Sequence, residues 1–151
     1  MIIFILLLFV AGFIFFMSSR DVDQSLGDSM TISRMMAYVL VDDFEDMSPE
    51  EQYQVLLDYD EPLRHIAHTL EFFALGGLMA FACLLLRRPI WLALIAGVGY
   101  GVLDEVHQIF VNGRGCQLSD MCFDTLGVLL SAGVIWLEIA RAKKKGWKGP
   151  G

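Results

Sequence analysis

Charged residues are scarce in this chain of 151 residues, and its few cysteines follow no recognisable pattern. Only 19% of the residues are charged and 56% are hydrophobic, whereas soluble domains average about 25% charged and about 45–50% apolar. Cys83, Cys116 and Cys122 form no C-x-x-C or C-x-x-H spacing, so neither a zinc module nor a disulfide framework is indicated. Cys116 and Cys122 can pair if their loop faces an oxidising space, and free thiols are the default expectation.

Charge is absent from four stretches, at 1–17, 72–86, 89–103 and 125–137. A helix needs about 20 residues to cross about 30 Å of hydrocarbon, so the last three are short and also suit buried helices of a soluble protein. The first is apolar on every side, however, and the others leave little polar surface to cover a soluble core. We therefore predict an all-α integral membrane protein with four spans, extended into neighbouring polar residues, at 1–18, 67–86, 89–108 and 120–140.

Basic residues predict the orientation of these spans. Arg87 and Arg88 separate the second and third spans, and the tail at 141–151 carries Arg141, Lys143, Lys144, Lys145 and Lys148. Residues 19–66 instead hold 12 acidic residues against three arginines. By the positive-inside rule, both termini are cytoplasmic and residues 19–66 are outside. The first stretch lacks a basic n-region and an A-x-A site, which favours a retained span over a cleaved signal peptide.

The outer segment at 19–66 is expected to be helical. Residues 30–40 are apolar at helical spacing, and Ser48, Pro49 and Glu51 are typical of a capped helix start. We expect that helix to end near Leu57 and a new one to begin at 60–62 and run into the second span. The predicted fold is a single domain over 1–151, a four-helix membrane bundle with a helical extracytoplasmic segment between the first two spans.

Each of the last three spans carries its polar residues at one end, and their alternating directions bring all three ends to the outer side. Spacings of three and four residues place many of them on shared helix faces. They are Arg64, His68 and Glu71, then Asp104, Glu105, His107 and Gln108, and then Asp120 and Asp124. Ionisable residues at membrane depth usually face the bundle interior or a wet cavity. We predict an outward-open pocket lined by His68, Glu71, Asp104, Glu105, Gln108, Arg114, Asp120 and Asp124.

Purely structural roles are the simpler interpretation for each of these residues alone. Arg64 can reach the interface or pair with Glu71, Asp120 can cap the fourth span, and Glu105 can pair with Arg114. The two histidines can simply be hydrogen-bonded residues. Small residues at Gly76, Ala80, Gly97, Gly99, Gly101, Gly127 and Ser131 suit close helix packing. A purely structural bundle nevertheless has little reason to gather four carboxylates, a histidine and an arginine at this depth.

Two motifs among these residues carry a family resemblance. Residues 64–72, RHIAHTLEF, with Leu75 and Gly76, resemble the R-K-x-A-H-x-x-E-Y-x-x-L-G stretch of the VanZ family. Residues 104–114, DEVHQIFVNGR, resemble its D-E-x-H-Q-x-F-x-P-G-R stretch. The pattern continues through Gln117, Asp120, Asp124, Thr125, Leu126 and Gly127, and Ser18-Ser19 is similar to the small polar exit of the family's first span. His65, Phe72 and Asn112 depart from the usual Lys, Tyr and Pro.

The resemblance implies a bacterial plasma-membrane protein of about four core helices, from a family named for association with teicoplanin resistance and with no agreed activity. We hypothesise an enzyme, a head-group or phosphoester hydrolase or transferase, acting on a phosphate-linked lipid or lipid-linked cell-wall precursor at the outer leaflet. His68, Glu71, Asp104, Glu105 and Gln108 are the candidate catalytic residues, and Arg64, His107 and Arg114 the candidate substrate-binding residues. Asp120 and Asp124 are candidate ligands of a divalent cation of the Mg²⁺ or Ca²⁺ type.

Three alternatives stay open. The first is a non-enzymatic protein that binds or shields cell-envelope components, in which residues 19–66 matter more than His68. The second is a small transporter or flippase subunit, against which the absence of an internal repeat counts. The third is a purely structural bundle. The expected partner is a membrane lipid or lipid-linked precursor, and no nucleic acid partner is indicated.

Overall fold

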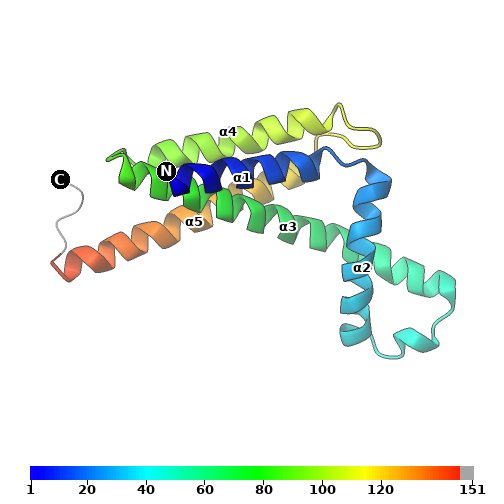
Figure 1. Cartoon of the computed structure of the whole chain (residues 1–151). Helices are drawn as coiled ribbons and strands as arrows, with labels where there is room; N and C mark the ends of the chain where they lie inside the picture. Colours follow the sequence, from blue (N-terminus) through cyan, green and yellow to red (C-terminus); the bar gives the residue numbers. More distant parts are fainter. Residues whose placement is uncertain (147–151) are drawn as a thin grey trace.

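The computed structural model describes residues 1–146, except for the side chain of Asp28, and every regular element in this range is a helix (Figure 1). In chain order they are α1 (Ile2–Ser18), α2 (Val22–Leu40), the 3₁₀ helix η1 (Phe44–Asp46), α3 (Pro49–Leu85), α4 (Trp91–Gln108) and α5 (Leu118–Lys144). The prediction of an all-α fold is confirmed. Lys148 of the basic tail lies outside the described residues.

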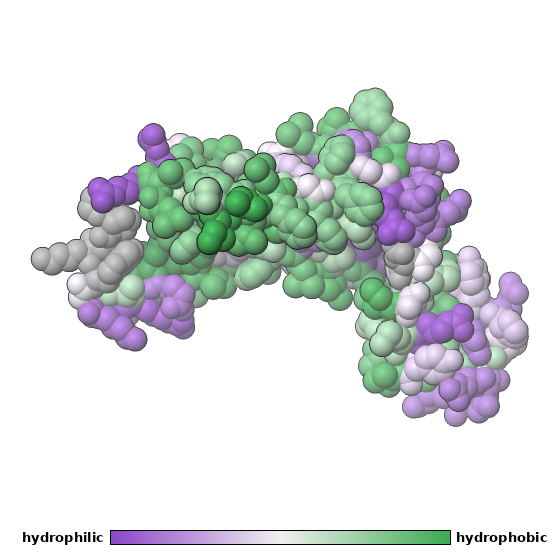
Figure 2. Space-filling model, in the orientation of Figure 1, coloured by the Kyte–Doolittle hydropathy of each residue, from purple (hydrophilic) through white to green (hydrophobic). Residues whose placement is uncertain are grey.

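The bundle consists of α1, α4, α5 and the second half of α3, which lie side by side in Figure 1. Its core is built from Ile14 of α1, Phe72 and Leu75 of α3 and Val128 of α5, against which partly buried residues of α4 pack. The largest interface joins α3 to α5. Hydrophobic residues cover the bundle between two hydrophilic ends (Figure 2), as expected of helices surrounded by hydrocarbon.

Glycine allows α3 and α5 to come this close. A Cβ added at Gly127 would lie 2.4 Å from the carbonyl oxygen of Thr69 and 2.8 Å from the amide nitrogen of Phe73. A Cβ added at Gly76 or at Gly97 would likewise lie 3.0 Å or less from an atom of Val128. The predicted packing role is confirmed for these glycines and for Gly101, where an added Cβ would lie 3.2 Å from the side chain of Asp124. At Gly99 an added Cβ would meet no atom within 4 Å, so close packing does not require glycine there.

Two helices, α3 and α5, are long and apolar enough to cross a membrane, and α1 with α2 forms a third candidate if the bent pair is one span. The predicted four-span bundle is therefore supported only in part. At a rise of 1.5 Å per residue, α1 with its 17 residues reaches about 26 Å, somewhat less than the hydrocarbon thickness. The 18 residues of α4 include Asp104, Glu105, His107 and Gln108, which lower its mean hydropathy.

The outer segment contains one long helix where two were predicted. The capping box at Ser48 and Glu51 is confirmed, but α3 continues unbroken from Pro49 to Leu85, and the predicted break before Pro62 is wrong. A proline inside a helix removes one hydrogen bond, here to the carbonyl of Asp58. Asp58 and Pro62 are both exposed, so water can take the place of the missing donor and the helix continues.

A second, smaller core holds this outer part together. Ala37 from α2, Phe44 from η1 and Leu56 from α3 are buried against one another. The axis of α2 is bent by 106° from that of α1, and α2 crosses the first half of α3 (Figure 1). This crossing leaves a space between α2 and the end of the bundle, which positions the candidate site.

Candidate functional site

A cavity of about 400 Å³ lies where α1 ends, beneath α2 and beside the middle of α3. One part of its wall is polar and the other apolar. The polar wall includes Arg64, His68, Glu71, Gln108, Arg114 and Gln117. The apolar wall includes Leu26, Ile32, Leu63, Ile66 and Leu70. Its volume is typical of a small-molecule pocket, and its two-sided lining suits an amphipathic ligand.

His68 is held by a carboxylate from the neighbouring helix. Its Nδ1 lies 2.9 Å from Oδ1 of Asp124, and both side chains are buried. With Asp124 ionised, Nδ1 donates this hydrogen bond, which leaves Nε2 as the basic atom of the ring. Nε2 lies 3.9 Å from Oδ2 of Asp120, which is too long for a hydrogen bond. The geometry therefore fixes the ring and leaves Nε2 available.

Asp120 lies at the centre of an ion-pair group. Its Oδ2 is 3.5 Å from Nε of Arg64, and its Oδ1 is 3.3 Å from Nε2 of His65. Arg64 also donates a hydrogen bond of 2.8 Å to the side chain of Gln117. Arg64 thus pairs with Asp120 and not with Glu71. Asp120 does not cap α5 either, because Gln117 occupies that position.

The two acidic residues of α4 are fixed differently. Oδ2 of Asp104 accepts hydrogen bonds from Oγ of Ser18 at 2.6 Å and from Nε2 of Gln108 at 3.2 Å. Oε2 of Glu105 accepts one from the backbone amide of Gln117 at 2.8 Å, in place of the expected pairing with Arg114. Both carboxylates are buried, Asp104 at 4% exposure and Glu105 at 0%. Hydrogen bonds from α1, α4 and the α4–α5 loop thus orient them.

Arg114 lies in the α4–α5 loop and lines the cavity. Within the described residues its guanidinium forms no hydrogen bond or ion pair that would occupy its donors. Partial burial lowers the pKa of Arg114 from its usual value, and the charge of Arg64 adds to the effect, while Asp104 and Asp120 oppose it. An arginine side chain stays charged at neutral pH despite such a shift. The cavity therefore contains a cation with unused donors.

Most of the predicted site residues are brought together. Glu71, Gln108, Arg64 and Arg114 line the cavity with His68, and Asp104, Glu105, Asp120 and Asp124 lie behind them. His107 does not join them. Its ring centroid lies 4.4 Å from that of Phe15 on α1, and it is not part of the cavity wall. The roles assigned to these residues remain predictions.

Two contacts were not predicted from the residues of the three later spans. Ser18, 5% exposed, reaches Asp104 across the bundle, and His65 reaches Asp120 while its ring stacks on Phe123 at 4.1 Å. A serine at the end of an otherwise apolar span was the available indication for Ser18. His65 is three residues before His68, a spacing that puts the two on neighbouring positions of α3 and was the available indication for it.

The predicted cation ligands, Asp120 and Asp124, are already engaged with arginine and histidine side chains. Among the described residues, His68, Asp104 and Glu105 each offer one ligand atom, and these three atoms lie within 4.8 Å of one another. The cation prediction itself stays a prediction.

Comparison with known proteins gives one match. A family model described as VanZ/LLP1 matches residues 3–140, which is most of the chain and includes every site residue discussed above. No curated protein and no solved structure matches the chain.

Proposed function

Since the chain belongs to the VanZ/LLP1 family, we propose that it is a multi-pass protein of the bacterial plasma membrane that binds a phosphate-linked lipid or lipid-linked cell-wall precursor at the outer leaflet and acts on its head group. The observation that carries the proposal is the cavity of about 400 Å³ with a charged wall and an apolar wall. A lipid head group with the start of its chain has the same two-sided character.

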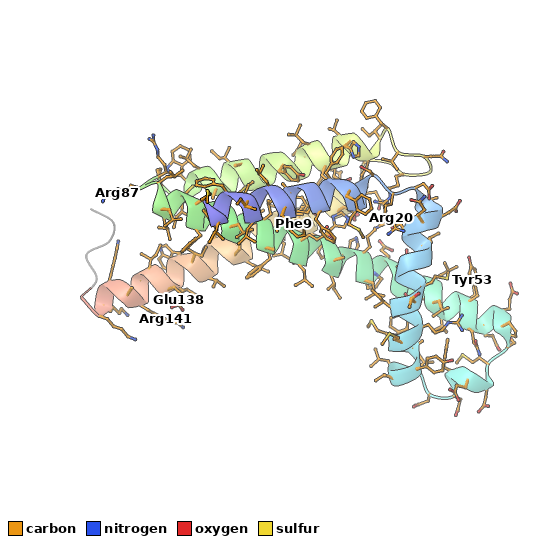
Figure 3. The ribbon with its side chains drawn as sticks, in the orientation of Figure 1. Phe9, Arg20, Tyr53, Arg87, Glu138 and Arg141 are labelled. Carbon is orange, nitrogen blue, oxygen red and sulfur yellow. The ribbon has the colours of Figure 1, made fainter. Side chains whose placement is uncertain are left out.

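The proposed orientation is supported by the positions of the basic residues. Arg87, between α3 and α4, and Arg141, at the end of α5, lie at the same end of the bundle (Figure 3). Arg20, which lines the cavity, lies at the opposite end (Figure 3). By the positive-inside rule, the first end is cytoplasmic and the cavity is extracytoplasmic. In this arrangement α1, the second half of α3, α4 and α5 are the four spans, and both termini are inside.

The position of α2 supports access from the outer leaflet. If α1 runs along the membrane normal, the bend of 106° lays α2 close to the membrane plane. Ile32, Met35 and Val39, at i, i+3 and i+7, form an apolar stripe that is 53%, 67% and 81% exposed. A helix of this kind lies in the interface with its apolar side towards the acyl chains. The cavity beneath α2 then opens at the level of the lipid head groups.

A phosphate would be recognised by Arg114. Its unpaired guanidinium can form charge-assisted, bidentate hydrogen bonds to phosphate oxygens. Leu63, Ile66 and Leu70 would contact the first part of the lipid chain. Arg64, already paired with Asp120, would contribute mainly through its charge.

His68 and Asp124 would supply the chemistry. Asp124 holds Nδ1, so Nε2 can accept a proton from water as that water attacks the phosphorus, and the phosphoester bond to the leaving oxygen then breaks. The imidazolium formed is stabilised by Asp124 and can return the proton to the leaving oxygen. Alternatively, Nε2 would attack phosphorus directly and displace the leaving oxygen, and water would then cleave the N–P bond of the phosphohistidine to release phosphate and restore His68. Glu71 and Gln108 border the same space and would position the attacking group.

The test uses alanine variants in a host whose teicoplanin susceptibility depends on this protein. His68→Ala, Arg114→Ala and Asp120→Ala are compared with Glu138→Gln, an exposed change at the opposite end of α5, at equal abundance in the membrane. The proposal expects loss of the phenotype in His68→Ala and Arg114→Ala and retention in Glu138→Gln. Full function in all three alanine variants would rule out catalysis at this site.

A non-enzymatic binding or shielding role is favoured by one observation, which is that Leu26 and Ile32 of the outer segment form part of the cavity wall. This alternative expects Ile32→Ser to abolish the phenotype while His68→Ala leaves it intact. The same set of strains therefore separates the two functions.

A further inference from the structure

Three buried side chains of the site offer ligand atoms that lie close to one another. His68 from α3 and Asp104 and Glu105 from α4 each present one such atom, and all three atoms lie within 4.8 Å of one another. We infer that this group binds a divalent transition-metal ion, with Zn²⁺ or Mn²⁺ as the matching class. The inference rests on the proposed function for what the ion would do: with Nε2 of His68 bound to it, the ion would take over from the imidazole the activation of the attacking water. Binding itself is measurable without substrate.

Each of the three ligands has its second polar atom held by another residue. Asp124 occupies Nδ1 of His68, which leaves Nε2 free to bind. This is the carboxylate–histidine–metal arrangement, in which the outer carboxylate fixes the tautomer and makes the imidazole a better ligand. Oδ2 of Asp104 is held by Ser18 and Gln108, which leaves the other carboxylate oxygen.

Glu105 provides independent evidence that the group has a ligand. Its side chain is 0% exposed, and its Oε2 is held by the amide of Gln117. Its other oxygen, Oε1, is buried and has no hydrogen-bond partner among the described residues. A buried carboxylate oxygen without a partner is strongly disfavoured, because its hydration is lost and nothing replaces it. A cation bound by His68 and Asp104 would supply that partner.

The local charge balance points the same way. Asp104, Glu105 and Asp124 are at most 4% exposed, Arg64 is already engaged with Asp120, and Arg114 forms no ion pair with these three among the described residues. Buried carboxylates in this density either take up protons or require a compensating cation. A divalent ion between them would offset two of these charges.

The donor set indicates the class of metal. One imidazole and two carboxylates, without a thiolate, suit Zn²⁺ or Mn²⁺, whereas Ca²⁺ prefers six to eight oxygen ligands. Bonds of about 2.0–2.2 Å would draw the three atoms closer together than 4.8 Å by small side-chain rotations. Three protein ligands also leave a coordination position open for water or a phosphate oxygen.

The experiment is calorimetric titration of the purified, chelator-treated full chain in nanodiscs with ZnCl₂ and MnCl₂, each alone. We expect one ion per chain for at least one of the two metals, and at least tenfold weaker binding in Glu105→Gln and Asp104→Asn. Glu61→Gln, an exposed acidic residue on α3, serves as the matched control and should bind as the wild type does. Thermal unfolding of each variant without metal confirms that it is folded.

Absence of binding for both metals in the wild type, or unchanged binding in folded Glu105→Gln, would overturn the inference. If the ion binds but no phosphate-linked lipid does, the metal site stands and the proposed function fails. If neither metal binds but the lipid is bound and processed, the proposed function stands and the metal site fails.

Discussion

Replacing Gly127 by alanine would place a methyl group against the backbone of α3. The new carbon would lie 2.4 Å from the carbonyl oxygen of Thr69 and 2.8 Å from the amide nitrogen of Phe73. An ordinary contact between carbon and oxygen is about 3.4 Å, so the helices must separate by about 1 Å. Because the obstructing atoms belong to the backbone, no side-chain rotation relieves the clash. We expect a loss of about 2–3 kcal/mol, at the upper end of the range for overpacking.

The same displacement would reach the site. Thr69 follows His68 on α3, and Asp124 lies one turn before Gly127 on α5. A separation of about 1 Å would break the 2.9 Å hydrogen bond between His68 and Asp124. Gly127→Ala should therefore lose both stability and any activity that depends on His68.

The assay is thermal or chemical unfolding of the purified protein in detergent, with Gly133→Ala as the control. Gly133 is on the same helix and has nothing within 4 Å of the added carbon, so alanine there should be neutral or stabilise by up to about 1 kcal/mol. Equal stability of Gly127→Ala and Gly133→Ala would refute the close packing of α3 and α5.

Further predictions concern topology, the outer helix and the site. In single-cysteine variants of intact cells, a membrane-impermeant thiol reagent should label Cys116, which is exposed in the α4–α5 loop, and not Cys83; the reverse pattern would invert the proposed orientation. Hydrogen bonds from Ser48 lower the pKa of Glu51 in the folded protein below the usual glutamate pKa of 4.5. The capping box therefore stabilises the start of α3 fully at a pH above 4.5, and this stabilisation is lost as the pH falls through the lowered pKa of Glu51. The protection factor for hydrogen exchange at the first turn of α3, which corrects the measured rate for the intrinsic pH dependence of exchange, should therefore fall in acid in the wild type and change less in Ser48→Ala. Asp124→Asn should lower the rate of any reaction at His68 by about 10²–10⁴-fold, since the amide no longer stabilises the imidazolium, while lipid affinity changes little; equal loss of affinity would indicate a structural role.

Much of this architecture could be predicted from the sequence because hydrocarbon imposes strict requirements. The predicted spans at 1–18, 89–108 and 120–140 match α1, α4 and α5 to within four residues at each end, and small residues at Gly76 and Gly127 marked the α3–α5 interface. The convergence of polar residues followed from the alternating direction of the helices. These inferences depend on periodicity and length, which a single sequence displays directly.

Other features depend on information that periodicity does not contain. The continuity of α3 through Pro62 depends on whether the carbonyl of Asp58 is exposed to water, which only the packed structure determines. The partners within the site depend on helix rotation: Asp120 meets Arg64 and His65, Asp124 meets His68, and His107 turns towards α1. A rotation of a few tens of degrees would exchange these partners, and residue spacing does not fix it to that accuracy.

The cavity itself was predicted only as a polar pocket. Part of its apolar wall, Leu26 and Ile32, comes from α2, whose position follows from the bend of 106° after α1 and from the small core around Phe44. Residue types in 19–66 indicated a helix there but not where it would lie. The two-sided lining, which most favours a lipid as ligand, is therefore a result of the tertiary structure.

The most direct measurement titrates a polyprenyl phosphate and the corresponding polyprenol into the protein in nanodiscs. The account predicts that the phosphate form binds at least tenfold tighter, and that Arg114→Leu weakens its binding by about 10- to 100-fold, the loss of one charge-assisted contact. Arg88→Leu, at the opposite end of the bundle, should change nothing. Equal affinity for the two lipids, or unchanged phosphate binding in Arg114→Leu, would contradict the claim that this cavity recognises a phosphate-linked lipid.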